Sequence, residues 1–435
     1  MRIANCLDRR HPAATSLPGP SRARSYAHGR GKFSHEVIPK PARIAIVPRK
    51  YKRYGIPLEA FRKEISGGAP PDAIGVGSMM TYWSPGVAET IALARETWPG
   101  VPVILGGVYA TLCASHAKKY AGADYVVEGP GEEEFVRILR DIIGGAGGGQ
   151  SNSCEHARDS SPKKTGLRMT FMPAYHLLQK LDSVSMLTSF GCPFACAYCA
   201  SRLLRRGFVQ RPVAEVVDEI AFYVQQMNIH DIAFCDDALL VNPDRHIKPI
   251  LREVIGRGLR ARFHTPNGLH ADMIDEELAG LMKAAGFATV RLSLESIDPV
   301  RLRDSCVKVT PDGFRRAVSN LFAAGYGAGD IEAYALMGVP GQREKEVEET
   351  IRFARDAGAV VRLSDFSPIP GTSYFEAAKR EYGIELADPL LQNSSVYPYL
   401  VPGLREQYAR LKALAQSVNS DLLRRRSLPR CEIVP

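Results

Sequence analysis

Residues 189–200 read Ser-Phe-Gly-Cys-Pro-Phe-Ala-Cys-Ala-Tyr-Cys-Ala and place Cys192, Cys196 and Cys199 in one short loop. The loop follows an apolar, strand-like run over residues 184–187. Three thiolates this close together repel one another unless a metal neutralises their charge. A structural zinc ion takes four protein ligands, whereas an iron–sulfur cluster also uses cysteine thiolates. A cluster held by only three cysteines keeps one iron open for a substrate, so the loop indicates catalysis.

The spacing C-x3-C-x2-C, with Tyr198 just before the last cysteine, resembles the radical S-adenosylmethionine (radical SAM) superfamily. The resemblance implies that Cys192, Cys196 and Cys199 hold a 4Fe-4S cluster whose open iron binds S-adenosylmethionine (SAM). An electron from the cluster then splits the sulfonium and releases a 5′-deoxyadenosyl radical. The alternative is a zinc knob or three unrelated core cysteines.

Length and composition describe an ordinary globular chain. Its 435 residues predict two to three domains. We find no apolar run of about 18 residues, which a membrane-spanning helix needs, and no apolar signal core at the N-terminus. Nine cysteines, three of them in a ligand-like loop, favour a reducing compartment. We therefore expect a cytoplasmic protein without a membrane partner.

The net charge of +9 is concentrated at the N-terminus. Residues 1–53 carry thirteen basic and two acidic side chains, a net charge of +11. A basic segment can bind an anionic ligand or nucleic acid. Because this segment has no matching run of stacking aromatic residues, we predict a solvated, mostly irregular arm over residues 1–41 and no nucleic-acid partner.

Residues 42–143 alternate between strand-like and helix-like patterns. Apolar runs at 72–78, 101–105 and 125–127 predict parallel strands of a Rossmann-like sheet. Such sheets bind ligands beyond the carboxyl ends of their strands, where glycine lets the backbone approach a ligand closely. The candidate ligand-binding residues at these ends are Ser78, Thr81, Gly106, Gly107, Thr111, Gly129 and Gly131. Tight-turn glycines without a ligand are the alternative.

Two of these loops, Gly-Gly-Val-Tyr-Ala-Thr at 106–111 and Glu-Gly-Pro-Gly-Glu at 128–132, are similar to those of the cobalamin-binding domain that precedes many radical SAM domains. The resemblance implies a cobalamin site at the strand ends. Two features depart from the family. The Asp-x-His-x-x-Gly motif is absent, which excludes cobalt ligation by that histidine. The first βα unit of the domain is also missing, and its loss predicts an open sheet edge.

Residues 144–166 are rich in Gly, Ser and Lys and predict a flexible linker. Strand and helix patterns then alternate about every 30–40 residues, as in βα units. We predict strands at 184–188, 231–235, 262–265, 289–294, 331–336 and 361–366, and helices at 213–227, 275–285 and 311–324. These residues resemble the partial (βα)6 TIM-type barrel of radical SAM enzymes, which we assign to residues 167–390.

Polar and glycine residues follow each predicted strand, and in a parallel barrel these ends meet at one face. The resemblance implies that Tyr198 packs near the adenine of SAM. It places Asp236 and Asp237 at the methionine end, Ser293 and Glu295 at the ribose or sulfonium, and Gly338, Pro340 and Gly341 beside the adenine. For each residue a cap or turn is the alternative. His264, Asn267 and His270 are candidates for substrate contact, although a structural histidine is the simpler interpretation.

Residues 391–435 carry an apolar stripe at helical spacing and predict a helix packed on the barrel. The predicted fold is therefore α/β: a Rossmann-like front domain, a partial barrel and a C-terminal helical segment. By resemblance, we predict a radical SAM enzyme with a cobalamin-type domain, whose family chemistry is often methyl transfer to an unactivated carbon. Such an enzyme needs an external electron donor of the flavodoxin or ferredoxin type. The sequence does not identify the substrate, small molecule or peptide.

Three other interpretations stay open. The first is a radical SAM enzyme that does not use cobalamin. The second is a catalytically decayed cofactor-binding protein, and the third is a zinc-dependent nucleic-acid binder. Methylthiotransferase activity is not favoured, because no N-terminal set of three cysteines for a second cluster is present.

Overall fold

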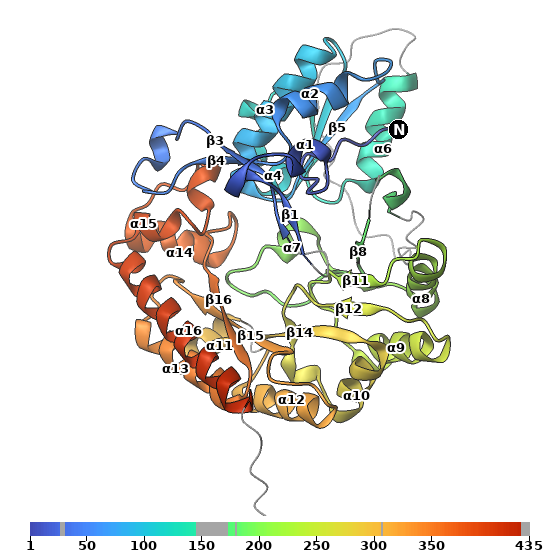
Figure 1. The fold of residues 1–435 in the computed structure, drawn as a ribbon. Helices are drawn as coiled ribbons and strands as arrows, with labels where there is room; N and C mark the ends of the chain where they lie inside the picture. Colours follow the sequence, from blue (N-terminus) through green and yellow to red (C-terminus); the bar gives the residue numbers. More distant parts are fainter. Residues whose placement is uncertain (27–30, 145–172, 179–180, 306–307, 428–435) are drawn as a thin grey trace, which may run out of the picture.

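The computed structural model describes residues 1–26, 31–144, 173–178, 181–305 and 308–427. Figure 1 shows two α/β lobes stacked on each other, the N-terminal lobe above and a partial barrel below. The predicted linker, 144–166, lies outside the described residues apart from Gly144. Within the described ranges, none of the helices combines the length and apolarity needed to cross a lipid bilayer.

The front lobe is built on three parallel strands in the order β5 (Ile74–Ser78), β6 (Val103–Gly107) and β7 (Tyr125–Val126). Side chains of β6 alternate between the two faces. Val103 and Leu105 pack with Ile91 of α3 (Ser84–Thr97), and Ile104 packs with Ile138 of α6 (Glu132–Gly144). Helices α4 (Val108–Leu112) and α5 (Ala114–Tyr120) follow β6. The sheet is thus covered on both faces, as its apolar runs predicted.

Strand β5 forms the edge of this sheet. Among the described strands, β5 pairs only with β6. Its residues Gly75 and Gly77 are exposed. Within the described residues, this edge of the sheet is therefore open.

The described residues of 1–41 are mostly irregular and largely exposed or half-buried, with α1 (Pro12–Thr15), β1 (Arg24–Ser25), β2 (Gly31–Lys32) and β3 (His35–Val37) as short elements. Strand β1 pairs with β2, and β3 pairs with β4 (Lys52–Tyr54), which is followed by α2 (Leu58–Ser66). Ala14 and Ala23 are buried with Phe61 and Leu93. Arg53 forms ion pairs with two glutamates, Glu36 and Glu89. This apolar cluster and these ion pairs hold the segment on the front lobe.

The barrel strands run in chain order and in parallel. They are β8 (Ser183–Met186), β11 (Asp231–Phe234), β12 (Arg262–His264), β14 (Phe287–Glu295), β15 (Ile331–Met337) and β16 (Val360–Asp365), with β13 (Leu269–His270) beside β14. All six predicted strands are confirmed. The short strands β9 (Ser189–Gly191) and β10 (Phe208–Gln210) form an antiparallel pair around the cysteine loop.

Helices cover the outside of the barrel, as expected for βα units. They are α8 (Val213–Ala221), α9 (Ile247–Gly256), α10 (Glu276–Ala285), α11 (Pro299–Asp304), α12 (Pro311–Ala323), α13 (Glu344–Ala357) and α14 (Ser373–Tyr382), while the short helix α7 (Ser201–Leu204) follows the cysteine loop and contacts the front lobe. The helix predicted over 213–227 ends in a π-helical turn at Phe222–Gln226. Phe234 of β11 and Phe263 of β12 belong to the apolar core shared by strands and helices, and their rings stack with centroids 4.9 Å apart.

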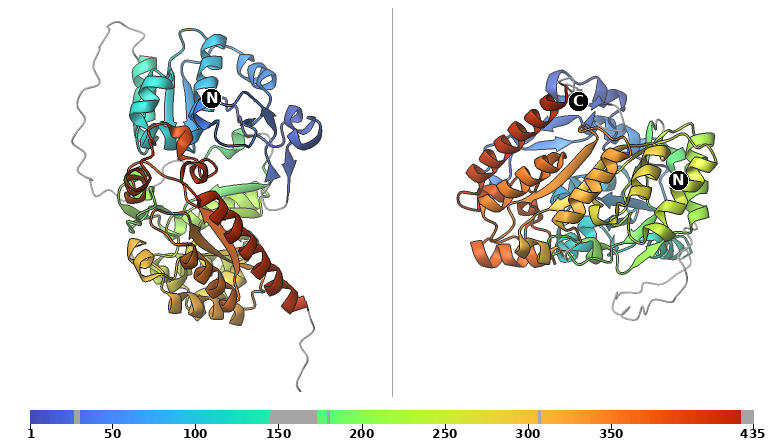
Figure 2. Two further views of the ribbon diagram at one scale, coloured as in Figure 1. Left: turned by 90° about the vertical axis from the view of Figure 1, so that its left-hand side faces the viewer. Right: turned by 90° about the horizontal axis from the view of Figure 1, so that it is seen from below.

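The C-terminal segment contacts both lobes. It contains α15 (Tyr397–Leu400) and the long helix α16 (Leu404–Ser427), which runs along the outside of the barrel (Figure 2). Val418 and four other residues of the predicted stripe, Leu404, Tyr408, Leu411 and Ala415, are buried. Before α15, Leu390 and Val396 pack against Ile44 and Val47 of the N-terminal segment. The predicted C-terminal helix is therefore confirmed.

Candidate functional site

The cysteine loop is held in place by its backbone. Gly191 has φ +75°, and a Cβ there would lie 2.1 Å from the carbonyl oxygen of Gly207 on the paired strand. The Ala197 N–H donates to the Asp304 carbonyl at 2.9 Å, and the Ala197 carbonyl accepts from the Tyr374 N–H at 3.0 Å. Glycine is needed at 191 because no side chain fits there. The loop is thus fixed on both sides before any metal binds.

Cys192, Cys196 and Cys199 line one cavity of about 440 Å³. The first two side chains are buried and the third is exposed. The cavity also takes residues from the carboxyl ends of five barrel strands: Asp237, Asn267, Gly268, His270, Ser293, Glu295, Tyr334 and Ser364. The polar residues at these strand ends therefore meet at one face of the barrel, as predicted.

The surroundings of the cysteines favour a cationic group between them. Burial raises the pKa of Cys192, and a hydrogen bond from the Phe194 backbone and the positive charge on Lys308 oppose that rise. A structural zinc ion takes four protein ligands, whereas an iron–sulfur cluster is held by cysteine thiolates.

Lys308 is a cavity residue that sequence reasoning missed. Its Nζ lies 3.4 Å from Oε1 of Glu295 and 5.5 Å from the ring centroid of Tyr198. Burial by itself would lower the pKa of Lys308, but Glu295 and the sulfurs of Cys196 and Cys199 raise it above the ordinary value. Lys308 therefore stays charged beside the cysteines. It lies in a connection without periodic pattern, so no sequence signal marked it.

Ser293 and Glu295 lie at the cavity as predicted. Glu295 has φ +64°, a left-handed conformation that is uncommon outside glycine. The register between β14 and β15 shifts between these two residues. Bulges of this kind re-aim side chains next to active sites. The bulge brings both side chains to the cavity wall, where Glu295 is paired and Ser293 is buried.

The two neighbouring aspartates at the end of β11 have different environments. Asp237 lines the cavity, where burial raises the pKa of its carboxyl group and a hydrogen bond from Ser201 opposes the rise. Asp236 does not line the cavity. It is 3% exposed and bonds to Thr188 and Ser189 instead. Asp237 is thus the aspartate placed to meet a ligand.

Tyr198 and the loop 338–341 do not line the cavity directly. The Tyr198 hydroxyl is buried without a hydrogen-bond partner, and its ring lies under Lys308. Gly338 has φ +86°, and a Cβ there would lie 2.0 Å from Oη of Tyr408 on α16. Gly338 therefore lets α16 approach the barrel closely.

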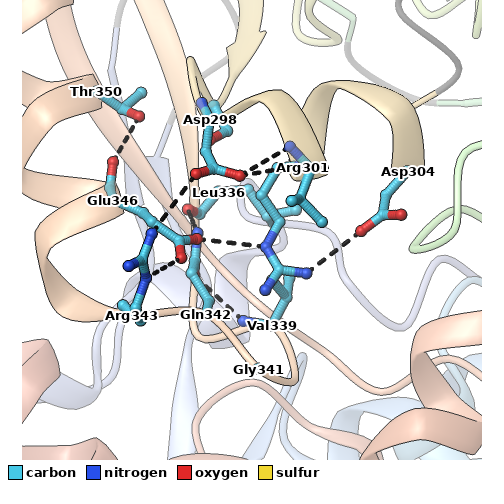
Figure 3. A network of polar contacts seen from close by, with 12 residues as sticks. Asp298, Arg301, Asp304, Leu336, Val339, Gly341, Gln342, Arg343, Glu346 and Thr350 are labelled. Atoms are coloured by element: carbon cyan, nitrogen blue, oxygen red, sulfur yellow. Dashed lines mark hydrogen bonds and ion pairs between the residues drawn. The ribbon is translucent and has the colours of Figure 1, made fainter.

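A network of polar contacts involves loop 338–341 and residues of α11 and α13 (Figure 3). The Gln342 side chain accepts from the Gly338 N–H at 2.7 Å and donates to the Leu336 carbonyl at 3.0 Å. Arg301 of α11 pairs with Glu346 of α13 and with Asp304. Because the Asp304 carbonyl also accepts from the cysteine loop, the network links loop 338–341 to the cysteines. Pro340 is buried in this loop, whereas Gly341 is exposed.

The three candidates for substrate contact near β12, namely His264, Asn267 and His270, have different surroundings. His264 bonds to Asp231 at 2.9 Å, away from the cavity, in the structural role that was the simpler interpretation. Asn267 lines the cavity while its amide donates to the Cys235 carbonyl. His270 lines the cavity and stacks on Phe194 with centroids 4.7 Å apart, and burial lowers the pKa of its imidazole to about 3. His270 is therefore a neutral side chain that faces the cavity.

The predicted residues of the front lobe meet at the carboxyl edge of its sheet. Thr111 connects two of the loops, because its hydroxyl donates to the Gly107 carbonyl at 2.9 Å and accepts from the Gly129 N–H at 2.9 Å. Gly107 has φ +91°, and a Cβ there would meet the Ser78 carbonyl at 2.4 Å. Gly131 lies against Val127.

This edge offers space for a large planar ligand. A Cβ at Gly77, Gly106 or Gly129 would meet no atom within 4 Å. The apolar Met79, which follows β5, is 69% exposed. The backbone of this edge is therefore accessible to a ligand at three glycines. Thr81, in contrast, is buried in the 3-10 turn Thr81–Trp83, below this surface.

The two candidate sites lie on facing sides of the lobe junction. Helix α7, which directly follows Cys199, packs against α4, which follows the front-lobe strand β6. Arg205 after α7 forms an ion pair with Glu132 at the start of α6. The glycine-rich edge is thus next to the segment that carries the cysteines.

Comparisons with known proteins agree with this architecture. Residues 186–354 match the family model of the radical SAM superfamily, and residues 53–139 match that of the B12 binding domain. An uncharacterized methyltransferase of Pyrococcus horikoshii is 27% identical over 326 residues, 71% of this chain and 69% of the relative. The anaerobic magnesium-protoporphyrin IX monomethyl ester cyclase of Rubrivivax gelatinosus is 23% identical over 66% of this chain and 55% of its own.

A solved structure shares the fold of both lobes. It is the radical SAM methyltransferase TsrM from Kitasatospora setae with cobalamin and a 4Fe-4S cluster bound. It superposes with a TM-score of 0.60 at 20% identity, over 74% of this chain and 67% of that protein.

The fold and the site define a two-lobed cofactor enzyme with a B12-type domain in front of a cysteine-loaded barrel. The chain carries a radical SAM domain over residues 186–354 and, in front of it, a B12-binding domain over residues 53–139. These two domains imply a 4Fe-4S cluster and SAM as cofactors, with cobalamin for the front lobe. They also argue against the zinc-dependent nucleic-acid binder.

Proposed function

We propose that the protein is a cobalamin-dependent radical SAM methyltransferase that acts on an unactivated carbon. The observation that carries the proposal is the open glycine edge of the B12-type sheet beside the cysteine cavity, joined by α4 and α7. When bound, the cluster supplies an electron for cleaving SAM, and cobalamin carries the methyl group. Methyltransferase relatives support this choice.

The residues of the chain have separable roles in this proposal. The three cysteines hold the cluster, and Asp237 receives the methionine end of SAM. Ser293 and Glu295 hold its ribose side, while Lys308 forms an ion pair with Glu295 and balances the charge of the thiolates. Tyr198 and the loop 338–341 support the adenine side of the SAM site in this proposal.

A radical SAM reaction without cobalamin is the second candidate, and the unpaired edge of β5 favours it. One of the similar proteins is named a cyclase rather than a methyltransferase. A decayed cofactor-binding protein would keep the fold and lose the chemistry. We further propose an acidic flavodoxin- or ferredoxin-type electron donor and a cytoplasmic location.

One preparation tests these alternatives. The protein is purified without oxygen, reconstituted with iron and sulfide, mixed with hydroxocobalamin and desalted, and its absorption spectrum is recorded. It is then incubated with dithionite and methyl-labelled SAM, and 5′-deoxyadenosine and corrinoid-bound label are quantified. Cys196→Ala protein is the control.

Retained corrinoid bands, cluster absorption near about 400 nm, labelled corrinoid and 5′-deoxyadenosine support the methyltransferase. Cluster bands and 5′-deoxyadenosine without retained corrinoid favour the cobalamin-free reaction. Equal 5′-deoxyadenosine from wild type and Cys196→Ala would contradict both and support a decayed protein.

A further inference from the structure

Asp236 is bound from several directions by the segment that leads into the cysteine loop. Its carboxylate accepts from the backbone N–H of Thr188 at 2.9 Å and of Ser189 at 2.6 Å. It also accepts from the hydroxyl groups of the same two residues, at 2.8 and 2.7 Å. Burial raises the pKa of Asp236, and these four donors oppose the rise. A carboxylate with this many donors is matched to the ionised form.

A buried histidine extends this arrangement to α9. The Thr188 hydroxyl has one proton, which it donates to Asp236. His246 Nε2, 3.0 Å from Thr188 Oγ1, must therefore be the donor of the next hydrogen bond. Burial lowers the pKa of His246 to about 4, so its ring is neutral with the proton on Nε2. The result is a directed chain from His246 through Thr188 to Asp236.

A buried ion pair holds the same backbone from the other side. The Arg211 N–H donates to the Thr188 carbonyl at 2.9 Å, and its guanidinium donates to the Leu187 carbonyl at 2.6 Å. Arg211 and Glu219 lie 2.6 Å apart, with side chains 4% and 3% exposed. Burying such a pair costs desolvation energy that apolar residues would not. We infer that this cost is offset because the pair fixes the backbone of Leu187 and Thr188.

The segment so fixed ends at the cluster ligands. Ser189 begins β9, and Cys192 directly follows the end of this three-residue strand. We propose that Asp236 is a positioning residue that acts through Thr188 and Ser189 to place Cys192 for cluster binding, rather than a contact of SAM. The inference rests on the proposed function only in requiring that the three cysteines hold a cluster.

The hydrogen bonds of Asp236 and Thr188 predict how strongly each substitution disturbs cluster binding. Asn at 236 can keep one oxygen toward the four donors, but its amide NH2 then takes the place of Oδ2, which accepts from the Thr188 N–H at 3.1 Å, and the negative charge is lost. Val at 188 removes one hydroxyl bond to Asp236 and leaves the His246 N–H without its acceptor. Ser at 188 keeps the hydroxyl. We therefore expect Asp236→Asn to be worst, Thr188→Val intermediate and Thr188→Ser close to wild type.

Two other aspartates, Asp231 at the start of β11 and Asp237 just after its end, provide matched controls. Asp237→Asn changes the neighbouring residue, which lines the cavity. Asp231→Asn changes a buried acid at the other end of β11, where it bonds to Arg262 and His264. The amino ends of barrel strands serve stability rather than chemistry. All variants are prepared anaerobically as full chains and reconstituted in parallel.

The measurements are iron per chain, the electron paramagnetic resonance (EPR) spectrum and midpoint potential of the reduced cluster, 5′-deoxyadenosine yield with dithionite, SAM affinity, and thermal midpoint Tm. For Asp236→Asn we expect lost iron or a changed EPR spectrum, and a yield lower by about tenfold or more, as for outer-shell partners of metal ligands. For Asp237→Asn we expect wild-type iron and weakened SAM binding. For Asp231→Asn we expect a lower Tm with an unchanged cluster.

Wild-type iron, EPR spectrum and yield in both Asp236→Asn and Thr188→Val would overturn the proposal. So would weakened SAM binding in Asp236→Asn with the cluster unchanged, because that pattern marks a SAM contact. If Asp236→Asn does not fold, the comparison of Thr188→Val with Thr188→Ser decides. A wild-type chain that binds no cluster would instead contradict the proposed function.

Discussion

Lys308 brings a positive charge into the cavity that the three cysteines share. Its side chain is 11% exposed and that of its partner Glu295 is 14% exposed, so the pair is largely removed from water. Removing one partner of a buried pair leaves the other charge uncompensated, at a cost of about 3–5 kcal/mol. Lys308 also screens the sulfurs of Cys196 and Cys199, which raise its own pKa.

We therefore predict that Lys308→Met weakens both cluster retention and SAM binding by about tenfold or more, since it breaks this pair. Iron per chain and SAM affinity are measured after anaerobic reconstitution. Lys283→Met is the control, because Lys283 also lies over an aromatic ring, at 4.5 Å from the Tyr326 centroid, away from the cavity. Equal losses in the two variants would contradict the role of Lys308.

Two buried histidines predict an acid-sensitive barrel. Burial lowers the pKa of His246 to about 4 and that of His270 to about 3, whereas an unfolded chain titrates near about 6.5. As pH falls from 6.5 toward 4, the unfolded chain takes up protons that the folded chain does not, so stability falls in this window. We expect the Tm to fall between about pH 7 and about pH 5, and less steeply in His246→Gln. An identical slope in both proteins would exclude His246 as a cause.

At the scale of elements, the sequence predicted strands well and side-chain direction poorly. The six barrel strands were found because strand and helix patterns alternate about every 30–40 residues, as in βα units. Asp236 and Asp237 could not be separated, because successive residues of a strand point to opposite sides and only the register shows which side is the cavity. Lys308 and the N-terminal segment lack any periodic pattern. Their positions depend on tertiary contacts, such as the bond to Glu295 and the burial of Ala14.

Helix α16 closes the barrel at its last strand. The Asn419 side chain accepts from the Val361 N–H at 2.8 Å and donates to the Val361 carbonyl at 2.9 Å. An edge strand with free N–H and C=O groups is a site for aggregation. We predict that Asn419→Ala destabilises the barrel by about 1–3 kcal/mol, the cost of leaving buried backbone groups unbonded. Thermal unfolding and light scattering measure it, with exposed Gln416→Ala as the control. No change relative to Gln416→Ala would show that β16 needs no cover.

For the whole molecule, two kinds of contact connect the lobes. The Arg205–Glu132 ion pair is partly exposed, with side chains 22% and 60% accessible. Such pairs contribute about 0–1 kcal/mol. The apolar cluster of Ile44 and Val47 with Leu390 and Val396 is buried, and each such side chain contributes about 1.5–3 kcal/mol. The apolar cluster, rather than the ion pair, is therefore expected to hold the lobes together.

The last prediction uses a pair of neighbouring isoleucines. Ile44 is 5% exposed in this cluster, whereas Ile46 is 60% exposed. Ile44→Asp buries an unpaired carboxylate, which apolar surroundings do not tolerate, so the front lobe should separate from the C-terminal segment. We expect faster proteolysis between the lobes and loss of retained corrinoid, while iron bound by the barrel stays at the wild-type level. Ile46→Asp should leave all three unchanged. Corrinoid retained by Ile44→Asp would mean that the front lobe binds it without the barrel, and loss of iron as well would mean that the lobes fold as one unit.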